Sequence, residues 1–196
     1  MNQRLLLWGN VLVKVALLLL LAHAVVFAGL PQYVGKGIAA RLVLYPLGVA
    51  VVPLAWLLVR RRRVGGSPAY PLLADLLVSS PFTIDTLGNA LNLFNTVEVW
   101  DDIMHFTQWA LLMGGLGLLL RPRVARRWVF VLLVVSLGAH LAVWWEVAEY
   151  FAFIRVSPEL QTAYTDTLGD LVLGTLGAGL AAGLLLRPWP ADRLRC

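Results

Sequence analysis

Apolar residues run along the chain in six long segments that are separated by short polar stretches. The segments cover residues 5–30, 38–59, 70–94, 102–120, 128–153 and 166–186. A helix needs roughly 20 mostly apolar residues to cross a bilayer, because each residue advances it by about 1.5 Å. The pattern therefore predicts an all-α, polytopic bundle of six transmembrane helices, which forms one integral membrane domain over residues 1–196.

The overall composition agrees with this class. Hydrophobic residues make up 60% of the chain and charged residues 14%, and the mean hydropathy is +0.78. So little polar surface excludes a water-soluble globule of this length.

The first apolar segment also has features of a signal peptide. Arg4 precedes it, and the sequence Ala-His-Ala at residues 22–24 resembles a cleavage site. However, Lys14 interrupts the apolar run, and the run exceeds the usual length of a signal-peptide core. A retained helix is therefore the favoured interpretation.

Basic residues collect in alternate loops, at residues 60–63, 121–127 and 187–195, and Arg4 follows the same pattern. Short loops rich in Lys and Arg stay in the cytoplasm. We therefore predict a multi-pass protein of the bacterial inner membrane with both termini in the cytoplasm. The net charge of +5 then serves topology and contact with membrane lipid, and no nucleic acid partner is expected.

On this topology, nine of the eleven acidic residues fall in or beside the outer half of the membrane: Asp85, Glu98, Asp101, Asp102, Glu146, Glu149, Glu159, Asp166 and Asp170. Only Asp75 and Asp192 lie toward the cytoplasm. A carboxylate in hydrocarbon costs about 2.5–3.5 kcal/mol on insertion scales, so these groups should face the bundle interior and have partners.

Helical spacing places a histidine beside two of these acids. Asp101 and Asp102 lie four and three residues before His105, so either carboxylate can share a helix face with the imidazole. Glu146 and Glu149 are three residues apart near the outer end of the next helix. The helix dipole opposes negative charge there, so these glutamates need a proton, a basic side chain or a metal cation.

Two more helices add polar groups at similar depth. The last helix opens with Asp166 and Asp170, four residues apart, and the third helix carries Asp85, Asn89 and Asn92 along one stripe. Four helices thus present polar faces on the same side of the membrane.

The expected cations are too few to neutralise these acids, because the outer half offers only Lys36, Arg41 and Arg155. The single cysteine, Cys196, excludes a thiolate cluster. Carboxylates with imidazole suit a divalent ion such as Zn, Mn, Mg or Ca. The predicted ligands are Asp101, Asp102, His105, Glu146, Glu149, Asp166 and Asp170, with Asp85, Asn89 and His140 as a supporting polar stripe.

Simpler interpretations exist for individual residues. Asp101 and Asp166 can be helix N-caps, and His140 alone on an apolar helix is more often a hydrogen-bonded core histidine. Asp75 is expected to pair with the basic run at residues 60–63. The glycines at 169, 174, 177, 179 and 183 indicate close helix packing rather than phosphate binding.

Three motifs carry a family resemblance: WDDIMHF at residues 100–106, EVAEY at 146–150 and DTLGDL at 166–171. Over roughly residues 80–180, the chain resembles the YjdF-like family of uncharacterised bacterial membrane proteins and, more distantly, the VanZ-like family associated with glycopeptide resistance. The resemblance assigns the acid that precedes the His-Phe pair to Asp101 rather than Asp102.

This chain departs from the VanZ-like pattern at three positions. That pattern carries a basic residue, a glutamine and an asparagine where this chain has Asp102, Glu149 and Asp170. The resemblance therefore implies a more acidic site here, and it supplies no reaction.

The residues support three classes of function. The favoured class is a metal-dependent enzyme that acts on lipids or anionic lipid-linked envelope precursors, with His105 and Glu149 as catalytic candidates, each either a metal ligand or a general base. A cation or proton transporter that uses Asp85 and His140 is the alternative. A noncatalytic envelope accessory protein that binds calcium is the third.

Overall fold

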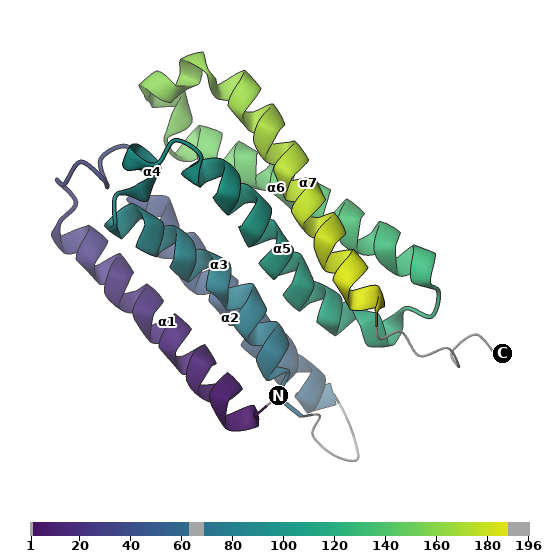
Figure 1. Ribbon diagram of the computed structural model, residues 1–196. Coiled ribbons are helices and arrows are strands. Elements are labelled where there is room, and N and C mark those ends of the chain that lie inside the picture. Colours follow the sequence, from purple (N-terminus) through teal and green to yellow (C-terminus); the bar gives the residue numbers. More distant parts are fainter. Residues whose placement is uncertain (1, 63–68, 188–196) are drawn as a thin grey trace.

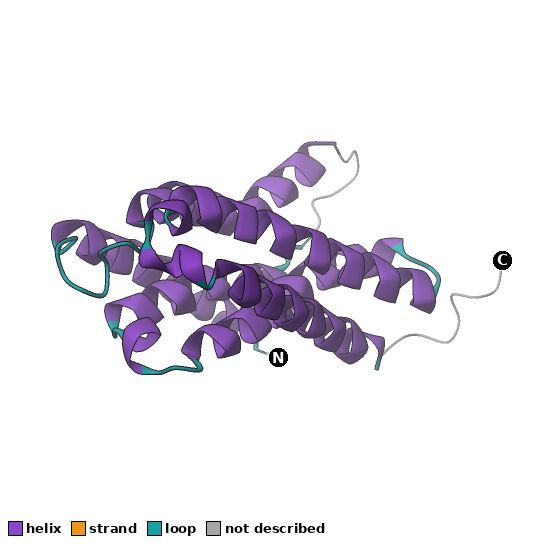
Figure 2. Cartoon of the chain, turned by 90° about the horizontal axis from the view of Figure 1, so that it is seen from above, coloured by secondary structure: helices purple, strands orange, loops and turns teal. Residues whose placement is uncertain are grey.

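The structure, a computed structural model, describes residues 2–62 and 69–187. The described residues form seven α-helices: α1 (Gln3–Val26), α2 (Ile38–Arg62), α3 (Leu72–Ala90), α4 (Leu93–Thr96), α5 (Trp100–Leu120), α6 (Arg127–Ala152) and α7 (Ala163–Leu186). Short 3-10 turns follow α5 at Arg121–Arg123 and join α6 to α7 at Ile154–Val156 and Pro158–Gln161. The all-helical prediction is confirmed for this part of the chain (Figure 2).

The long helices run alternately up and down and pack side by side (Figure 1). Neighbours in space are α1 with α3, α3 with α5, and α5 with α7, while α2 packs on α3 and α6 packs on α7. The loop after α1, the short α4 and the turns between α6 and α7 all lie at one end of the bundle (Figure 1). This end carries the acidic residues that the sequence analysis assigned to the outer half of the membrane.

Five of the described helices are long and apolar enough to cross a membrane: α1, α2, α5, α6 and α7. The third predicted span, α3, does not belong to this set. It is interrupted by six buried polar residues, at positions 75, 79, 83, 85, 86 and 89. The count of six spans and the cytoplasmic placement of both termini therefore stay predictions.

Some of the buried polar groups of α3 have partners outside that helix. Asp75 forms an ion pair with Lys14 of α1 and accepts a hydrogen bond from the Tyr70 hydroxyl at 2.7 Å. Thr83 donates to the backbone carbonyl of Val13 at 3.0 Å. The prediction that Asp75 pairs with the basic run is wrong for the described part of that run, because α1 packs along α3 and brings Lys14 to it.

α3 ends earlier than predicted, at Ala90 instead of residue 94. Asn92 then adopts a left-handed backbone conformation with a φ of 61°, which an α-helix does not accommodate. It follows that Asn92 leaves the stripe formed by Asp85 and Asn89.

Two helices begin before the acids that were expected to cap them. The N-cap of α5 is Val99 and the N-cap of α7 is Thr162, so Asp101 and Asp166 lie in the first turn of each helix. Neither aspartate is therefore the N-cap of its helix, which was the simpler interpretation of both residues.

The closest helix contact joins α5 and α7 around a glycine. A Cβ atom on Gly177 would lie 2.3 Å from the backbone oxygen of Phe106, so only glycine permits this approach. Gly174 similarly faces the Trp109 ring, whereas a Cβ on Gly169, Gly179 or Gly183 would meet nothing within 4 Å. Of the five glycines at which close helix packing was predicted, two, Gly174 and Gly177, are confirmed as close contacts.

Candidate functional site

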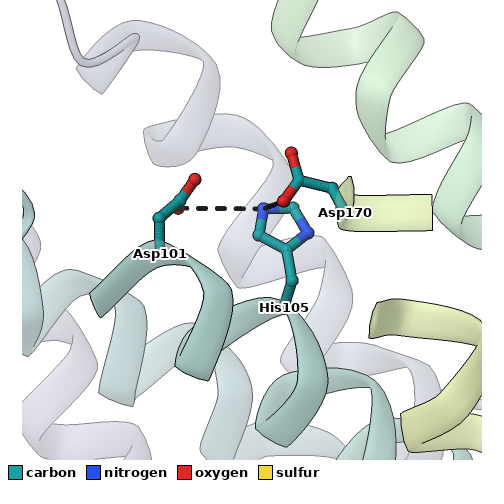
Figure 3. A group of neighbouring side chains, drawn as sticks. All are labelled: Asp101, His105 and Asp170. Carbon is teal, nitrogen blue, oxygen red and sulfur yellow. Dashed lines mark ion pairs between the residues drawn. The ribbon is translucent and has the colours of Figure 1, made fainter. Parts of the chain in front are cut away.

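His105 lies at the centre of the acidic end of the bundle. It sits about one turn into α5, and its residue surface is 8% exposed. Its Nε2 atom lies 3.8 Å from Asp101 Oδ1 on the same helix and 3.6 Å from Asp170 Oδ1 on α7 (Figure 3). Its Nδ1 atom lies 3.8 Å from Glu146 Oε1 on α6. Carboxylates from three helices therefore surround both ring nitrogens.

The local sequence explains why these groups meet. Four residues separate Asp101 from His105, so one turn of α5 places them on the same face. The close approach of α5 and α7 brings the first turns of α7, with Asp170, against that face. Thr167 donates a hydrogen bond to Glu146 Oε2 at 3.2 Å and so links α7 to α6.

Two buried polar atoms near this point have no hydrogen-bond partner in the described structure: His105 Nδ1 and Asn89 Oδ1. The distances of 3.6–3.8 Å around the imidazole are longer than hydrogen bonds. Buried polar atoms are nearly always satisfied in folded proteins, so unsatisfied ones indicate a place for water, an ion or a ligand.

Both atoms belong to residues that line a cavity of about 170 Å³. Its charged lining residues come from five helices and from the loops at this end of the bundle: Lys36, Arg41, Asp85, Asp101, Glu149, Glu159, Asp166 and Asp170. Asn89, His105, Gln108 and Trp145 also contribute to the wall. The cavity therefore contains three times as many acids as Lys and Arg side chains.

The two basic side chains in the cavity wall already have acidic partners. Arg41 Nε lies 3.0 Å from Asp85 Oδ2, and the Tyr45 hydroxyl donates to the same oxygen at 2.6 Å. Lys36 Nζ lies 3.1 Å from Glu159 Oε1. Among the described residues, the carboxylates around His105 have no ion pair with Lys or Arg.

Two groups of side chains have the composition of a metal site: Asp101 with His105 and Asp170, and His105 with Glu146 and Glu149. Within each group, one ligand atom per residue lies within 4.8 Å of the others. Zinc bonds of about 2.1 Å in tetrahedral geometry require donor atoms about 3.4 Å apart. The separations of 3.6–3.8 Å around the imidazole exceed this by a few tenths of an ångström.

Two predicted ligands lie at the margin of this arrangement. Asp102 is exposed and is not part of the cavity wall, because its position on α5 turns it away from the face that Asp101 and His105 share. Asp166 is exposed too, but it lines the cavity. Of the two adjacent aspartates of α5, Asp101 therefore lines the cavity beside His105, and Asp102 does not.

His140 does not extend the polar stripe. It is exposed on α6, and its Nε2 accepts a hydrogen bond from Trp144 Nε1 at 3.1 Å on the same helix. It is therefore hydrogen-bonded, as the simpler interpretation expected, but it lies outside the core and away from the cavity, because the rotation of α6 points this face outward. Asp85 and Asn89 do line the cavity.

Sequence reasoning missed the buried contact of Arg41 and Tyr45 with Asp85. A signal was present, since Arg41 and Tyr45 are four residues apart and therefore share one face of α2. It also missed Gln108, which lies between His105 and the apolar part of α5.

Comparisons with known proteins place the chain among membrane proteins. An uncharacterized protein of Thermotoga maritima is 30% identical over 118 residues, and this alignment covers 57% of the chain and 60% of that relative. No solved structure matches the chain. The family described as "Predicted membrane protein (DUF2238)" matches residues 13–188, a range that includes every candidate site residue. The chain therefore belongs to this family of predicted membrane proteins.

Proposed function

We propose that this membrane protein binds a divalent metal ion at His105, with ligands drawn from the carboxylates of Asp101, Glu146, Glu149 and Asp170. One observation carries the proposal. His105 is buried among carboxylates of α5, α6 and α7, and its Nδ1 atom has no hydrogen-bond partner in the described structure. A metal ion held by one ring nitrogen, with a carboxylate accepting from the other, would satisfy both sides of the ring.

The proposed ligands, several carboxylate oxygens and one imidazole nitrogen, favour a metal ion that binds both kinds of donor atom. Zinc and manganese suit imidazole together with carboxylates, and magnesium or calcium suits the carboxylates alone. The surplus of acids over basic side chains in the cavity supports a cation of high charge.

We further propose that the cavity faces the outer surface of the bacterial inner membrane and that the protein is an enzyme acting on lipid or lipid-linked substrates. The bound metal would polarise a phosphoryl or acyl oxygen and activate a water molecule. With His105 bound to the metal, Glu149 is the side chain in the cavity wall that would hold a proton during the reaction. The resemblance to YjdF-like and VanZ-like proteins adds no reaction, and these family names stay predictions.

One observation favours the alternative of cation or proton transport. Buried polar side chains continue along α3 from Asn89 and Asp85, through Thr83 and Ser79, to Asp75 near its other end. Proton-driven flux into liposomes that is lost in Asp85→Asn would support transport, whereas metal binding without flux would support the enzyme.

The test of the metal site is the metal content of purified protein, measured by inductively coupled plasma mass spectrometry. We expect a stoichiometric divalent metal in the wild type and its loss in His105→Ala and Glu149→Gln. Glu98→Gln is the matched control, because Glu98 is exposed and does not line the cavity. Absence of metal from the wild type, or equal metal in all four proteins, would contradict the proposal.

A further inference from the structure

An apolar groove of about 270 Å³ adjoins the acidic cavity. Its wall is formed mainly by hydrophobic side chains of α2, α3, α5 and α6, among them Leu44, Phe82, Leu112, Leu141 and Trp144. His105, Gln108 and Trp145 line both the groove and the cavity. A polar chamber and an apolar chamber therefore meet at the proposed metal site.

The groove opens toward the side of the bundle. Leu44 on α2 and Trp144 on α6 are 43% and 59% exposed, whereas Phe82, Leu112 and Leu141 are half-buried behind them. Both α2 and α6 have the length and composition of membrane-spanning helices. With these helices in a bilayer, the opening would face lipid. A hydrocarbon chain can reach the groove from the bilayer without passing through water.

We infer that the site takes a long-chain alkyl or isoprenyl phosphate, whose chain lies in the groove and whose phosphate reaches the acidic cavity. This inference rests on the proposed metal site. The continuity of the two chambers at His105, Gln108 and Trp145 selects an occupant with one apolar and one polar end.

The negative charge of the cavity affects how a phosphate can bind there. Arg41 and Lys36 are engaged by Asp85 and Glu159, so the remaining acids would repel a phosphate that arrives without a cation. A divalent ion that bridges carboxylates and phosphate oxygens reverses this repulsion. Binding of the phosphate is therefore expected to depend on the metal.

The groove contributes selectivity more than affinity. A hydrocarbon chain that moves from the bilayer into the groove leaves one apolar environment for another, so it gains no hydrophobic free energy. The shape of the groove then determines which chain fits, and filling the groove with a larger side chain is expected to exclude it.

The experiment uses a dodecyl phosphate that carries a diazirine near the end of its chain. The full-length protein, reconstituted in nanodiscs with Mn²⁺, is irradiated with the probe, and the labelled residues are mapped by mass spectrometry. We expect labelling of Leu112, Leu141 and their neighbours in the groove. EDTA, Leu112→Trp or Leu141→Trp should each reduce it by about tenfold, the order that overpacking or loss of a bridging ion produces.

The matched controls are Leu132→Trp, at an exposed position of α6, and a diazirine-bearing dodecylamine. Neither Leu132→Trp nor exchange of lipid should change labelling by the phosphate probe, and the amine should not label the groove in a metal-dependent way. Metal content measured on every variant separates a filled groove from a damaged site.

Several results would overturn the inference while leaving the metal site intact. Labelling spread evenly over lipid-facing residues would mean that the probe is dissolved in the bilayer. Labelling of the groove that is as strong in EDTA as in Mn²⁺, or as strong with the amine probe as with the phosphate probe, would show that a metal–phosphate contact is not required. Inorganic phosphate that binds as tightly as the probe and is unaffected by Leu112→Trp would assign the cavity to free phosphate. Absence of Mn²⁺ binding itself would instead refute the proposed function.

Discussion

His105 Nε2 on α5 lies 3.6 Å from Asp170 Oδ1 on α7, although 65 residues separate them in the chain. The contact exists because Gly177 lets the backbones of α5 and α7 approach closely. Within the same cluster, Asp101 contributes from the helix of His105 itself and Glu146 from α6. The site is therefore assembled by helix packing, and several predictions depend on this assembly.

Asp101 and Asp102 are neighbours in the chain, but we expect only Asp101 to contribute to metal binding. Asp101→Asn should weaken Mn²⁺ or Zn²⁺ binding by at least about tenfold, as loss of metal-site carboxylates typically does. Asp102→Asn should stay within about twofold, because Asp102 is exposed and outside the cavity wall. Isothermal titration of the metal-stripped proteins measures both, and equal losses would contradict the arrangement around His105.

Gly177 and Gly179 offer a matched pair for the α5–α7 contact. A Cβ on Gly177 would lie 2.3 Å from the Phe106 carbonyl oxygen and 3.0 Å from the Ala110 nitrogen, both backbone atoms, whereas a Cβ on Gly179 meets nothing within 4 Å. Gly177→Ala should therefore destabilise the fold by about 1–3 kcal/mol and weaken metal binding. Gly179→Ala should be neutral or slightly stabilising. Thermal unfolding in detergent compares them, and equal midpoints would speak against a close contact at Gly177.

The buried ion pair between Arg41 and Asp85 should matter more for stability than the pair between Lys36 and Glu159. Side-chain exposures are 10% and 6% in the first pair, against 18% and 45% in the second. Arg41→Ala leaves a buried carboxylate unpaired and should destabilise the fold by about 3–5 kcal/mol. Lys36→Ala should change it by about 0–1 kcal/mol.

Denaturant titration in detergent micelles measures both changes, with Asp85→Asn and the Arg41→Ala/Asp85→Asn double variant completing the cycle. The double variant should be less destabilised than the sum of the single variants, because it removes both charges together. Additive losses would show that Arg41 and Asp85 are not coupled.

His140→Ala should leave metal content unchanged. His140 is exposed, and its bonding partner Trp144 lies on the same helix, so the substitution should alter stability by no more than about 0.5 kcal/mol. A loss of metal in His140→Ala, measured beside His105→Ala, would return His140 to the site and contradict the orientation of α6.

The sequence alone determined that the chain forms long apolar helices. A segment of that length in lipid can satisfy its backbone hydrogen bonds only within a helix or a closed barrel, so hydropathy carries the information. It also determined the pairs that lie on one helix, such as Asp101 with His105, because a spacing of four residues fixes their common face.

Only the tertiary structure decided which acids meet and which histidine faces them. His105 points into the bundle and His140 points out, and Asp75 pairs with Lys14 of α1. These outcomes depend on how each helix is rotated about its axis and on how closely its neighbour approaches. Helices that are apolar all round do not encode that rotation in their hydropathy, because packing of small residues and buried polar pairs sets it instead.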